Sequence, residues 1–400
     1  MTSSQLRSHD SNQYIRYAWV LNNPGPGQCR RRKSKSKTCG DSFEATGCWK
    51  KVNDECSVHY KPGAVMRYLI PIIFSCLISV PFAIAHAVQF IDVEMVVYDE
   101  RFYKYIDANS QVEILASELE WAEGPVWIES LDSLLFSDVA ADKIYQWNEV
   151  KGLSVYLQPS GHAPDSASQL WRGSNGLAID IDGSLLLAQQ SSRAIARMLA
   201  PISNPDPHYE ILASHYGGNS INSPNDLVVH PSGDIYFTDP PYGLEGFDKS
   251  PDIELDFSGV FRLTGHGELI PVTRRISMPN GIALSNDHSI LYVSDSAENK
   301  AQILAIELDH QGNFEKTRLF FDGKDQISEG PGSTDGMVMH PTDYLFVSIP
   351  NGLGVLSPKG ELLGKIALGQ VTNMTLDDDF SHLYITSPKR LMRLKINSIK

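Results

Sequence analysis

Six short segments each begin with a carboxylate or carboxamide side chain followed by apolar residues, and these side chains could together bind a metal ion. They are Glu123, Asn175, Asn225, Asn280, Asp335 and Asn373. Carboxylate and amide oxygens are ligands for hard divalent cations such as Ca²⁺. Two carboxylates, Glu123 and Asp335, would balance the charge of one such ion. A cation with an open coordination position could polarise a carbonyl group for attack by water.

The six segments recur along the chain at spacings of 52, 50, 55, 55 and 38 residues. Each is followed 12 or 13 residues later by a second apolar segment, centred in turn on Phe136, Leu187, Phe237, Val293, Val347 and Ile385. Turn-forming residues such as Asp182-Gly183 lie between the paired segments. A repeat of about 50 residues with four short strands is typical of a β-propeller blade. The sequence therefore predicts an all-β, six-bladed propeller.

A propeller must close its ring, and the last repeat is short. We expect a strand near 111–116 to complete the blade that contains 391–396. The Gly-His and Trp-Asp signatures of seven-bladed WD repeats are missing, and a β-sandwich would not repeat one polar position six times. The innermost strand of each blade lines the central channel, so the six polar residues should form a ring around the axis.

The ring favours a metal site over a set of local turns. Asn-Gly and Asp-Gly are common turn pairs, and any single motif would indicate a turn. Six motifs in register need a different explanation, because a turn does not require convergent side chains. We expect Ca²⁺ rather than Mg²⁺ or Mn²⁺, since a flexible ring of oxygens suits its larger shell. Zn²⁺ would favour His or Cys ligands, which are missing from these positions.

Several of these motifs resemble those of the gluconolactonase and regucalcin family. They are Glu123-Gly-Pro-Val-Trp, Ser223-Pro-Asn-Asp-Leu, Tyr236-Phe-Thr-Asp-Pro-Pro-Tyr-Gly, Pro279-Asn-Gly-Ile-Ala and Asp335-Gly-Met. The similarity covers roughly residues 95–397, which we take as the propeller domain. The segment Val97-Tyr-Asp-Glu-Arg-Phe-Tyr also resembles secreted fungal lactonohydrolases. The resemblance implies a propeller with one divalent cation, usually calcium, that hydrolyses sugar lactones or related esters.

Residue by residue, the resemblance maps the metal ligands onto Glu123, Asn225, Asn280 and Asp335. The proton-transfer carboxylate falls on Asp335, with Asp226 as the alternative. Substrate-binding or supporting roles around the metal remain for Asn175, Asp226 and Asn373. The site is also similar to that of diisopropyl fluorophosphatase, so a phosphotriester hydrolase is a second interpretation. A non-catalytic binding scaffold with a structural ion is a third.

Substrate specificity should lie in the loops near 156–174, 240–258 and 322–334, with His162 and His215 at the pocket rim. Asp138, Asp239 and Asp295 end the second strand of three repeats, which indicates strand-end hydrogen bonds. His230 and His340 each precede a proline, which favours turn packing.

The N-terminal region differs from the rest of the chain. Residues 1–67 carry 12 basic and 5 acidic residues, whereas the whole chain has a net charge of −14. We expect 1–65 to be a disordered basic tail or a mis-assigned start, and 66–87 to be a signal peptide ending in Ala-His-Ala. The alternative is a signal anchor that makes a single-pass type II membrane protein with the propeller outside. Both interpretations export the propeller.

The remaining composition limits the possible partners. All five cysteines precede residue 77, so the propeller needs no disulfide, and the spacing of Cys29, Cys39, Cys48 and Cys56 supports a zinc site poorly. An acidic body repels nucleic acid, which disfavours nucleic-acid binding. We expect a monomer acting on a small-molecule lactone or ester, with membrane contact only if residues 68–88 stay uncleaved.

Overall fold

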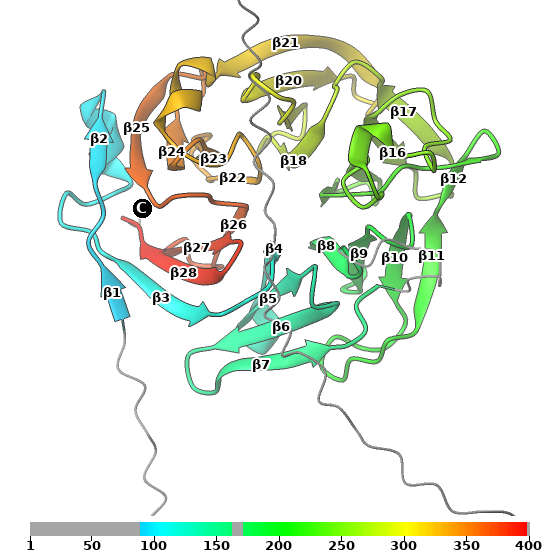
Figure 1. Cartoon of the computed structure of the whole chain (residues 1–400), viewed down its shortest axis with the longest axis horizontal. Coiled ribbons are helices and arrows are strands. Elements are labelled where there is room, and N and C mark those ends of the chain that lie inside the picture. The colour runs from blue at the N-terminus through cyan, green and yellow to red at the C-terminus, as the bar shows by residue number, and fades with distance from the viewer. Residues whose placement is uncertain (1–88, 162–170, 398–400) are drawn as a thin grey trace, which may run out of the picture. The chain divides into compact units, whose positions relative to one another are not determined.

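The computed structural model describes residues 89–161 and 171–397, which form six antiparallel sheets arranged around a central axis (Figure 1). This confirms the predicted six-bladed β-propeller. The expected tail at 1–65, the expected signal segment at 66–87, the five cysteines and His162 lie outside the described residues. Among the described residues, the structure has no helix of the length and apolar character needed to cross a membrane.

Each blade is a sheet whose innermost strand begins near one of the six polar positions. The first blade contains β4 (Ala122–Ile128), β5 (Ser133–Asp138), β6 (Lys143–Asn148) and β7 (Gly152–Leu157). The second contains β8 (Ser174–Ile179), β9 (Leu185–Gln189), β10 (Ala194–Met198) and β11 (Tyr209–Ala213). The third contains β14 (Leu227–Val229), β15 (Ile235–Asp239), β16 (Gly259–Leu263) and β17 (Leu269–Thr273). The fourth contains β18 (Pro279–Leu284), β19 (Ile290–Asp295), β20 (Gln302–Leu308) and β21 (Phe314–Asp322).

The last two blades each recruit strands from the N-terminal segment. The fifth contains β22 (Met337–Met339), β23 (Leu345–Ile349), β24 (Gly352–Leu356), β25 (Leu362–Ala367) and, at its outer edge, β2 (Met95–Val97). The sixth contains β26 (Asn373–Leu376), β27 (His382–Ser387), β28 (Arg390–Lys395), β3 (Val112–Ser117) and, outermost, β1 (Gln89–Ile91). The N-terminal and C-terminal ends of the propeller therefore lie in one sheet.

Ring closure occurs where the sequence predicts it. Strand β3 pairs antiparallel with β28, and Arg393 on β28 forms an ion pair with Glu113 on β3 at 2.6 Å. The additional edge strands β1 and β2 were not expected, and β1 begins six residues before the domain boundary predicted at residue 95. In Figure 1, β2 lies beside the orange β25, and β1 lies beside the cyan β3, which in turn lies beside the red β28.

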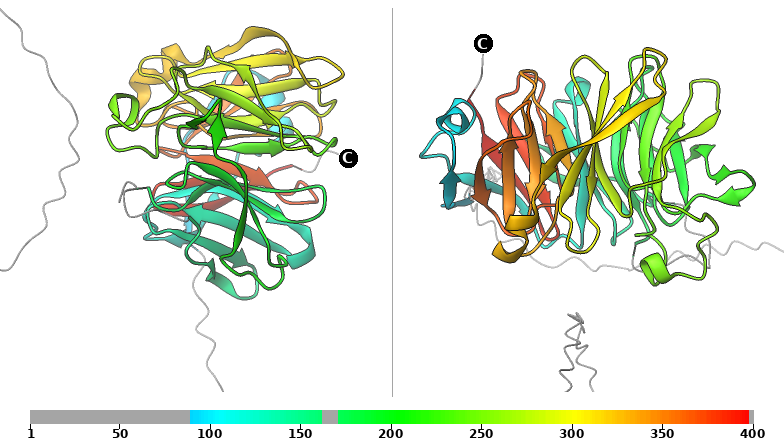
Figure 2. Two further views of the ribbon diagram at one scale, coloured as in Figure 1. Left: turned by 90° about the vertical axis from the view of Figure 1, so that its right-hand side faces the viewer. Right: turned by 90° about the horizontal axis from the view of Figure 1, so that it is seen from above.

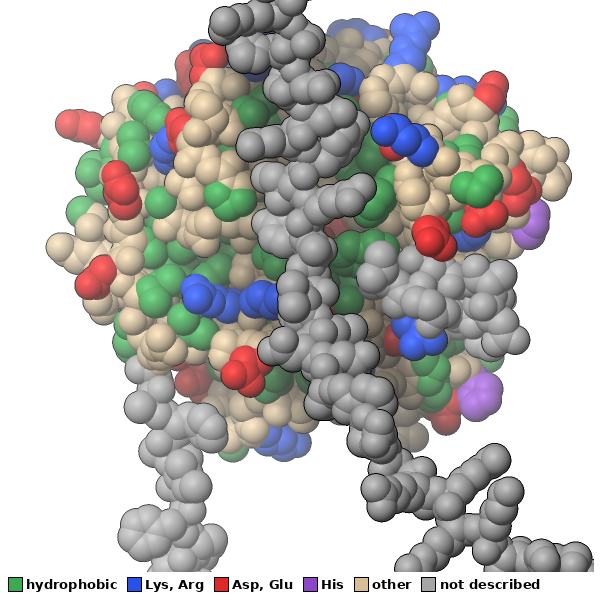
Figure 3. Space-filling view, viewed as in Figure 1, with side chains coloured by type: hydrophobic (Ala, Val, Ile, Leu, Met, Phe, Trp, Pro, Cys, Tyr) green, Lys and Arg blue, Asp and Glu red, His purple; other side chains and the backbone are tan. Residues whose placement is uncertain are grey.

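Short elements complete the described fold. The hairpin β12 (His215–Tyr216) and β13 (Asn219–Ser220) follows the second blade, and the 3₁₀ helices are η1 (Glu100–Lys104), η2 (Glu129–Leu131), η3 (Phe247–Lys249) and η4 (Lys324–Glu329). Seen from the side, the green η3 and the gold η4 project from the same face of the propeller (Figure 2). Acidic and basic side chains are interspersed around the propeller in the view of Figure 3.

The hydrophobic core lies within and between the blades. The six apolar residues predicted to mark the second strands are all fully buried: Phe136, Leu187, Phe237, Val293, Val347 and Ile385. In the third blade, the rings of Phe237 and Phe261 stack with their centroids 5.5 Å apart. Packing of these buried side chains joins neighbouring sheets. The hydrophobic effect therefore holds the inner strands at fixed positions around the axis.

The glycine that follows most of the polar ring residues allows close contact between neighbouring blades. A Cβ atom on Gly281 would lie 2.2 Å from the carbonyl oxygen of Asp335, and one on Gly176 would lie 2.8 Å from that of Asn225. Neither of these glycines requires a positive φ angle. The recurring Asn-Gly pairs are therefore not turns, because their glycines lie in inner strands that pack against the next blade.

We predict that Gly281→Ala destabilises the propeller, because the new methyl group must displace the backbone of Asp335. The expected loss is about 1–3 kcal/mol in the free energy of unfolding, typical of an overpacked core. Gly265→Ala is the matched control, since the nearest atom to its new Cβ would be 3.9 Å away. Chemical denaturation of both variants measures the difference. Equal stability of the two variants would show that the inner strands can move apart freely.

His340 is buried beside an aromatic cluster, which confirms its predicted packing role. Its ring lies 5.2 Å from that of Tyr105 and 6.0 Å from that of Phe346, and its Nδ1 pairs with the hydroxyl of Thr342 at 2.7 Å. Burial lowers the pKa of His340 below its usual value. The folded protein therefore favours the neutral imidazole.

This lowered pKa predicts a loss of stability in mild acid. The unfolded chain protonates this histidine near pH of about 6.5, so the stabilisation is complete above that value and is lost as the pH falls below it. His340→Gln should reduce the decrease in melting temperature between pH 7.5 and pH 5.5, whereas the exposed-site control His310→Gln should leave it unchanged. An unaltered pH profile in His340→Gln would refute this assignment.

Candidate functional site

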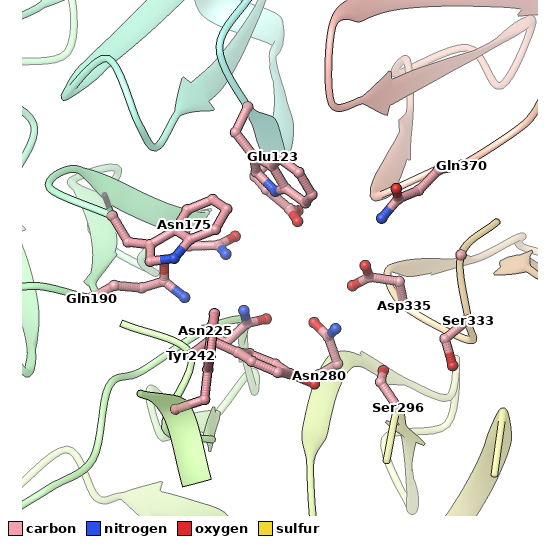
Figure 4. A pocket seen from close by; sticks show the side chains of 14 residues that line it. Glu123, Asn175, Gln190, Asn225, Tyr242, Asn280, Ser296, Ser333, Asp335 and Gln370 are labelled. Atoms are coloured by element: carbon pink, nitrogen blue, oxygen red, sulfur yellow. The ribbon is translucent and has the colours of Figure 1, made fainter. Parts of the chain in front are cut away.

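A cavity of about 300 Å³ lies at one end of the central channel, and five of the six predicted ring residues line it. Its lining residues are Trp121, Glu123, Trp171, Asn175, Gln190, Asn225, Tyr242, Phe247, Asn280, Ser296, Gly332, Ser333, Asp335 and Gln370. Figure 4 shows the side chains of Glu123, Asn225, Asn280 and Asp335 converging from different blades. The four residues predicted as metal ligands are therefore brought together.

Hydrogen bonds between neighbouring blades fix the backbone at this level of the channel. The hydroxyl of Thr238 donates to the carbonyl oxygen of Asn280 at 2.6 Å, and that of Ser294 donates to the carbonyl oxygen of Asp335 at 2.9 Å. The other four junctions have equivalent bonds. The hydroxyls of Ser137 and Ser174 join the first two blades, and the backbone amide of Gly176 donates to the carbonyl oxygen of Asn225 between the second and third. The backbone amide of Gly336 donates to the carbonyl oxygen of Thr372, and the hydroxyl of Thr372 donates to that of Ala122, which joins the sixth blade to the fifth and the first. Every blade junction is thus bonded beside a ring residue.

Aspartates at the ends of second strands hold the segments that lead into the ring. Asp138 accepts hydrogen bonds from the backbone amides of Glu120 and Trp121, at 3.0 and 2.7 Å. Asp239 accepts from the amide of Asn222 at 2.8 Å, and Asp295 accepts from the amide of Met278 at 3.2 Å. The predicted strand-end role of these three aspartates is confirmed.

Burial and neighbouring negative charge raise the pKa values of the carboxylates near the axis. Burial, followed by the charge of Asp226, raises the pKa of Glu123 to about 8, and burial raises the pKa of Asp226 to about 6. Burial, followed by the charges of Glu123 and Asp226, raises the pKa of Asp335 well above its usual value, although part of Asp335 faces the open cavity. Among the described residues, no lysine or arginine lines the cavity. The site therefore concentrates negative charge without a cationic side chain to balance it.

The lining residues fit a hard divalent cation with oxygen ligands. Glu123 and Asp335 supply carboxylates, and Asn225 and Asn280 supply amide oxygens. The Oδ1 atom of Asn175 is buried without a hydrogen-bond partner, so one more oxygen in the wall lacks a donor or a cation. The described residues contain no group of three or more His, Cys, Asp and Glu placed to hold a metal. Any ion here must therefore use amide oxygens.

Asp226 and Asn373 lie deeper in the channel than the sequence suggested. The amide of Asn373 donates to the carboxylate of Asp226 at 3.3 Å, and both residues line a second cavity, outside the first. Asp226 also accepts from the amide of Ile282. Direct substrate contact by Asn373 or Asp226 from the first cavity is therefore not supported. Instead of Asn373, the residue of this segment that lines the first cavity is Gln370, three residues earlier in the chain.

Sequence reasoning missed the aromatic wall of the cavity. Trp121 and Trp171 contact edge to face with centroids 5.0 Å apart, and Tyr242 hydrogen-bonds with the side chains of Asn280 and Ser296. Trp171, Tyr242, Phe247 and Ser333 all fall within the loops predicted to control specificity. The loops that contain these residues were predictable from the sequence, but the role of each residue was not. His215 is wrong as a rim residue, because it is exposed on β12 and does not line the cavity.

Comparison with known proteins matches the family model for the SMP-30/gluconolactonase/LRE-like region to residues 121–389. A gluconolactonase of Zymomonas mobilis is 36% identical over 305 residues, which cover 74% of this chain and 85% of that protein. A regucalcin of Danio rerio is 22% identical over 68% of this chain and 85% of its own length.

Among solved structures, a gluconolactonase of Xanthomonas campestris superimposes with a TM-score of 0.66 at 28% identity, covering 78% of this chain and 98% of that one. A calcium-binding regucalcin of Agrobacterium tumefaciens has a TM-score of 0.55 at 17% identity over 72% of this chain and 94% of its own, which supports the fold alone. The match over most of the propeller, together with the convergent carboxylates and amides, shows that the chain belongs to the SMP-30/gluconolactonase/LRE-like family.

Proposed function

We propose that this protein is a calcium-dependent lactonase that opens a sugar-derived or related lactone by attack of water on the ester carbonyl. The observation that carries the proposal is the convergence of Glu123, Asn280 and Asp335 in a cavity whose described lining residues include no cationic side chain. The relatedness to gluconolactonases supports the same chemistry.

The proposed ion site consists of Glu123, Asn225, Asn280 and Asp335. When bound, a divalent cation supplies a Lewis acid that polarises the ester carbonyl. Ca²⁺ fits this set better than Mg²⁺ or Mn²⁺, because uncharged amide oxygens contribute half of the ligands and the shell need not be octahedral. Zn²⁺ is disfavoured, since neither His nor Cys lines the cavity among the described residues.

In this proposal, Asp335 handles the proton of the attacking water. Its carboxylate faces the cavity, and its backbone amide donates to the hydroxyl of Ser348 at 2.6 Å, which fixes its position. Attack by water oxygen on the carbonyl carbon breaks the ring C–O bond, and a proton passes from the water to the departing alkoxide. Asp335 can accept the first proton and return it.

The neighbouring residues position this machinery and restrict water. Burial raises the pKa of Tyr242, so its hydroxyl stays neutral and holds the side chain of Asn280. Trp121, whose side chain hydrogen-bonds with Glu123, and Trp171 form an apolar wall that lowers the local dielectric constant. The alternatives of a phosphotriester hydrolase and a binding scaffold have no comparable support, because the relatives compared above are gluconolactonases and regucalcins.

Export remains a proposal that rests on the sequence of residues 66–87 alone. The charge pattern and the Ala-His-Ala end support a cleaved signal peptide over a signal anchor. We accordingly place the lactonase reaction outside the cytoplasm, with the protein acting as a monomer.

The prediction is that glucono-δ-lactone is hydrolysed by the Ca²⁺-loaded full chain, that chelation abolishes turnover, and that added Ca²⁺ restores it. Asp335→Asn should lower kcat by about 10²–10⁴-fold, because it removes both a ligand and a proton acceptor. The exposed Asp378→Asn serves as the control and should retain wild-type activity. A pH-indicator assay measures the turnover in each of these five reactions.

Two results would contradict the proposal in different ways. Turnover that is insensitive to chelation would refute the metal-assisted mechanism but leave the lactonase function standing. No turnover of glucono-δ-lactone, aromatic lactones or simple alkyl lactones would refute the lactonase function and favour the scaffold alternative.

A further inference from the structure

One hydrogen-bond donor in the cavity wall lacks an acceptor. The indole Nε1 of Trp171 is buried and has no hydrogen-bond partner among the described residues. A buried N–H without an acceptor costs free energy, so such groups are usually paired by a ligand or by water. Trp121 differs, because its side chain hydrogen-bonds with the carboxylate of Glu123. Because Trp171 lines the cavity, a molecule bound there could supply the acceptor that this buried N–H lacks.

Two glutamines add polar groups on opposite sides of the same cavity. Figure 4 shows Gln190 on the side of Asn175 and Gln370 on the side of Asp335, both at the periphery of the cavity. No hydrogen bond from either side-chain amide to a described residue is present, although Gln190 is only 2% exposed. Each amide offers a donor and an acceptor, which is the pattern that pairs with a hydroxyl group.

These groups lie around the proposed ion site rather than within it. Neither Trp171 nor the glutamines carries a charge, and the carboxylates that would hold the ion belong to Glu123 and Asp335. A lactone whose carbonyl points at the axis would extend its ring substituents outward toward this wall. Unpaired donors and acceptors in this wall favour polar substituents over apolar ones, because an apolar group would leave them buried and without hydrogen bonds.

We propose that Trp171, Gln190 and Gln370 are specificity-determining residues that bind substrate hydroxyl groups on both sides of the ester. The inference rests on the proposed lactonase function and assigns a role to residues outside the ion site. The indole N–H donates to one substrate oxygen, and the amides exchange hydrogen bonds with hydroxyls flanking the ester. The enzyme then prefers a polyhydroxylated lactone ring over an unsubstituted ring of the same size.

The experiment compares kcat/KM for glucono-δ-lactone and δ-valerolactone, which share a six-membered lactone ring and differ in hydroxylation. In the wild-type full chain, the ratio of the two should exceed the ratio of their uncatalysed hydrolysis rates. Trp171→Phe and Gln370→Leu should each lower kcat/KM for glucono-δ-lactone about tenfold, equivalent to about 1.4 kcal/mol. The values for δ-valerolactone should change by less than about twofold, because that ring has no hydroxyl to lose.

Matched controls separate recognition from stability. Trp127→Phe removes another buried indole N–H that has no partner but lies outside this cavity, and Gln311→Leu alters an exposed glutamine. Both controls should leave the two kcat/KM values unchanged. Melting temperatures confirm that each variant is folded, and the wild-type ratio tests the inference even if a variant fails to fold.

Three outcomes decide the matter. A wild-type ratio no larger than the uncatalysed ratio would overturn the inference while leaving the lactonase function intact. An equal decrease in kcat/KM for both lactones in the Trp171 and Gln370 variants would also overturn the inference, since that pattern indicates a structural role. Hydrolysis of neither lactone by the wild type would instead refute the proposed function, and the specificity assignment would fall with it.

Discussion

The structure depends on one electrostatic constraint, which is the burial of carboxylates close together on the axis of the propeller. Glu123 and Asp335 enter the cavity from different blades, and Asp226 lies deeper in the channel. Burial raises the pKa values of all three carboxylates, and neighbouring negative charges add to the rise at Glu123 and Asp335. Within the described part of the chain, no lysine or arginine lines the cavity. Such an arrangement is costly by itself and becomes favourable when a divalent cation is bound.

The propeller is built so that these groups cannot separate to relieve their repulsion. Hydrogen bonds at every blade junction fix the backbone beside the ring residues, as in the bond from Thr238 to Asn280. Gly281 brings one inner strand against the carbonyl oxygen of Asp335, where no side chain would fit. The closure of β3 onto β28 completes the ring and prevents it from opening. Rigid positioning of charged ligands is what a preorganised catalytic site requires.

Much of this arrangement was predictable from the sequence, because a repeat fixes equivalent residues at equivalent places. The spacing that identifies Glu123 and Asp335 as counterparts also places them on one ring, and the buried Phe136 and Phe237 follow from the same register. The sixth repeat differs from the other five. Asn373 aligns with the other openings, yet it pairs with Asp226 deeper in the channel, and Gln370 enters the cavity in its place. Residues of the irregular loops, such as Trp171, have no periodicity from which a position can be inferred, and the edge strand β2 pairs with a blade distant in sequence.

The central claim, that oxygen atoms from several blades surround one cation, is tested most directly by a crystal structure of the protein grown with Ca²⁺, using long-wavelength anomalous diffraction. The account predicts one strong anomalous peak on the axis, bonded to side-chain oxygens of Glu123, Asn280 and Asp335. A fully occupied peak elsewhere, or these three side chains turned away from an axis that holds only water at saturating Ca²⁺, would contradict it.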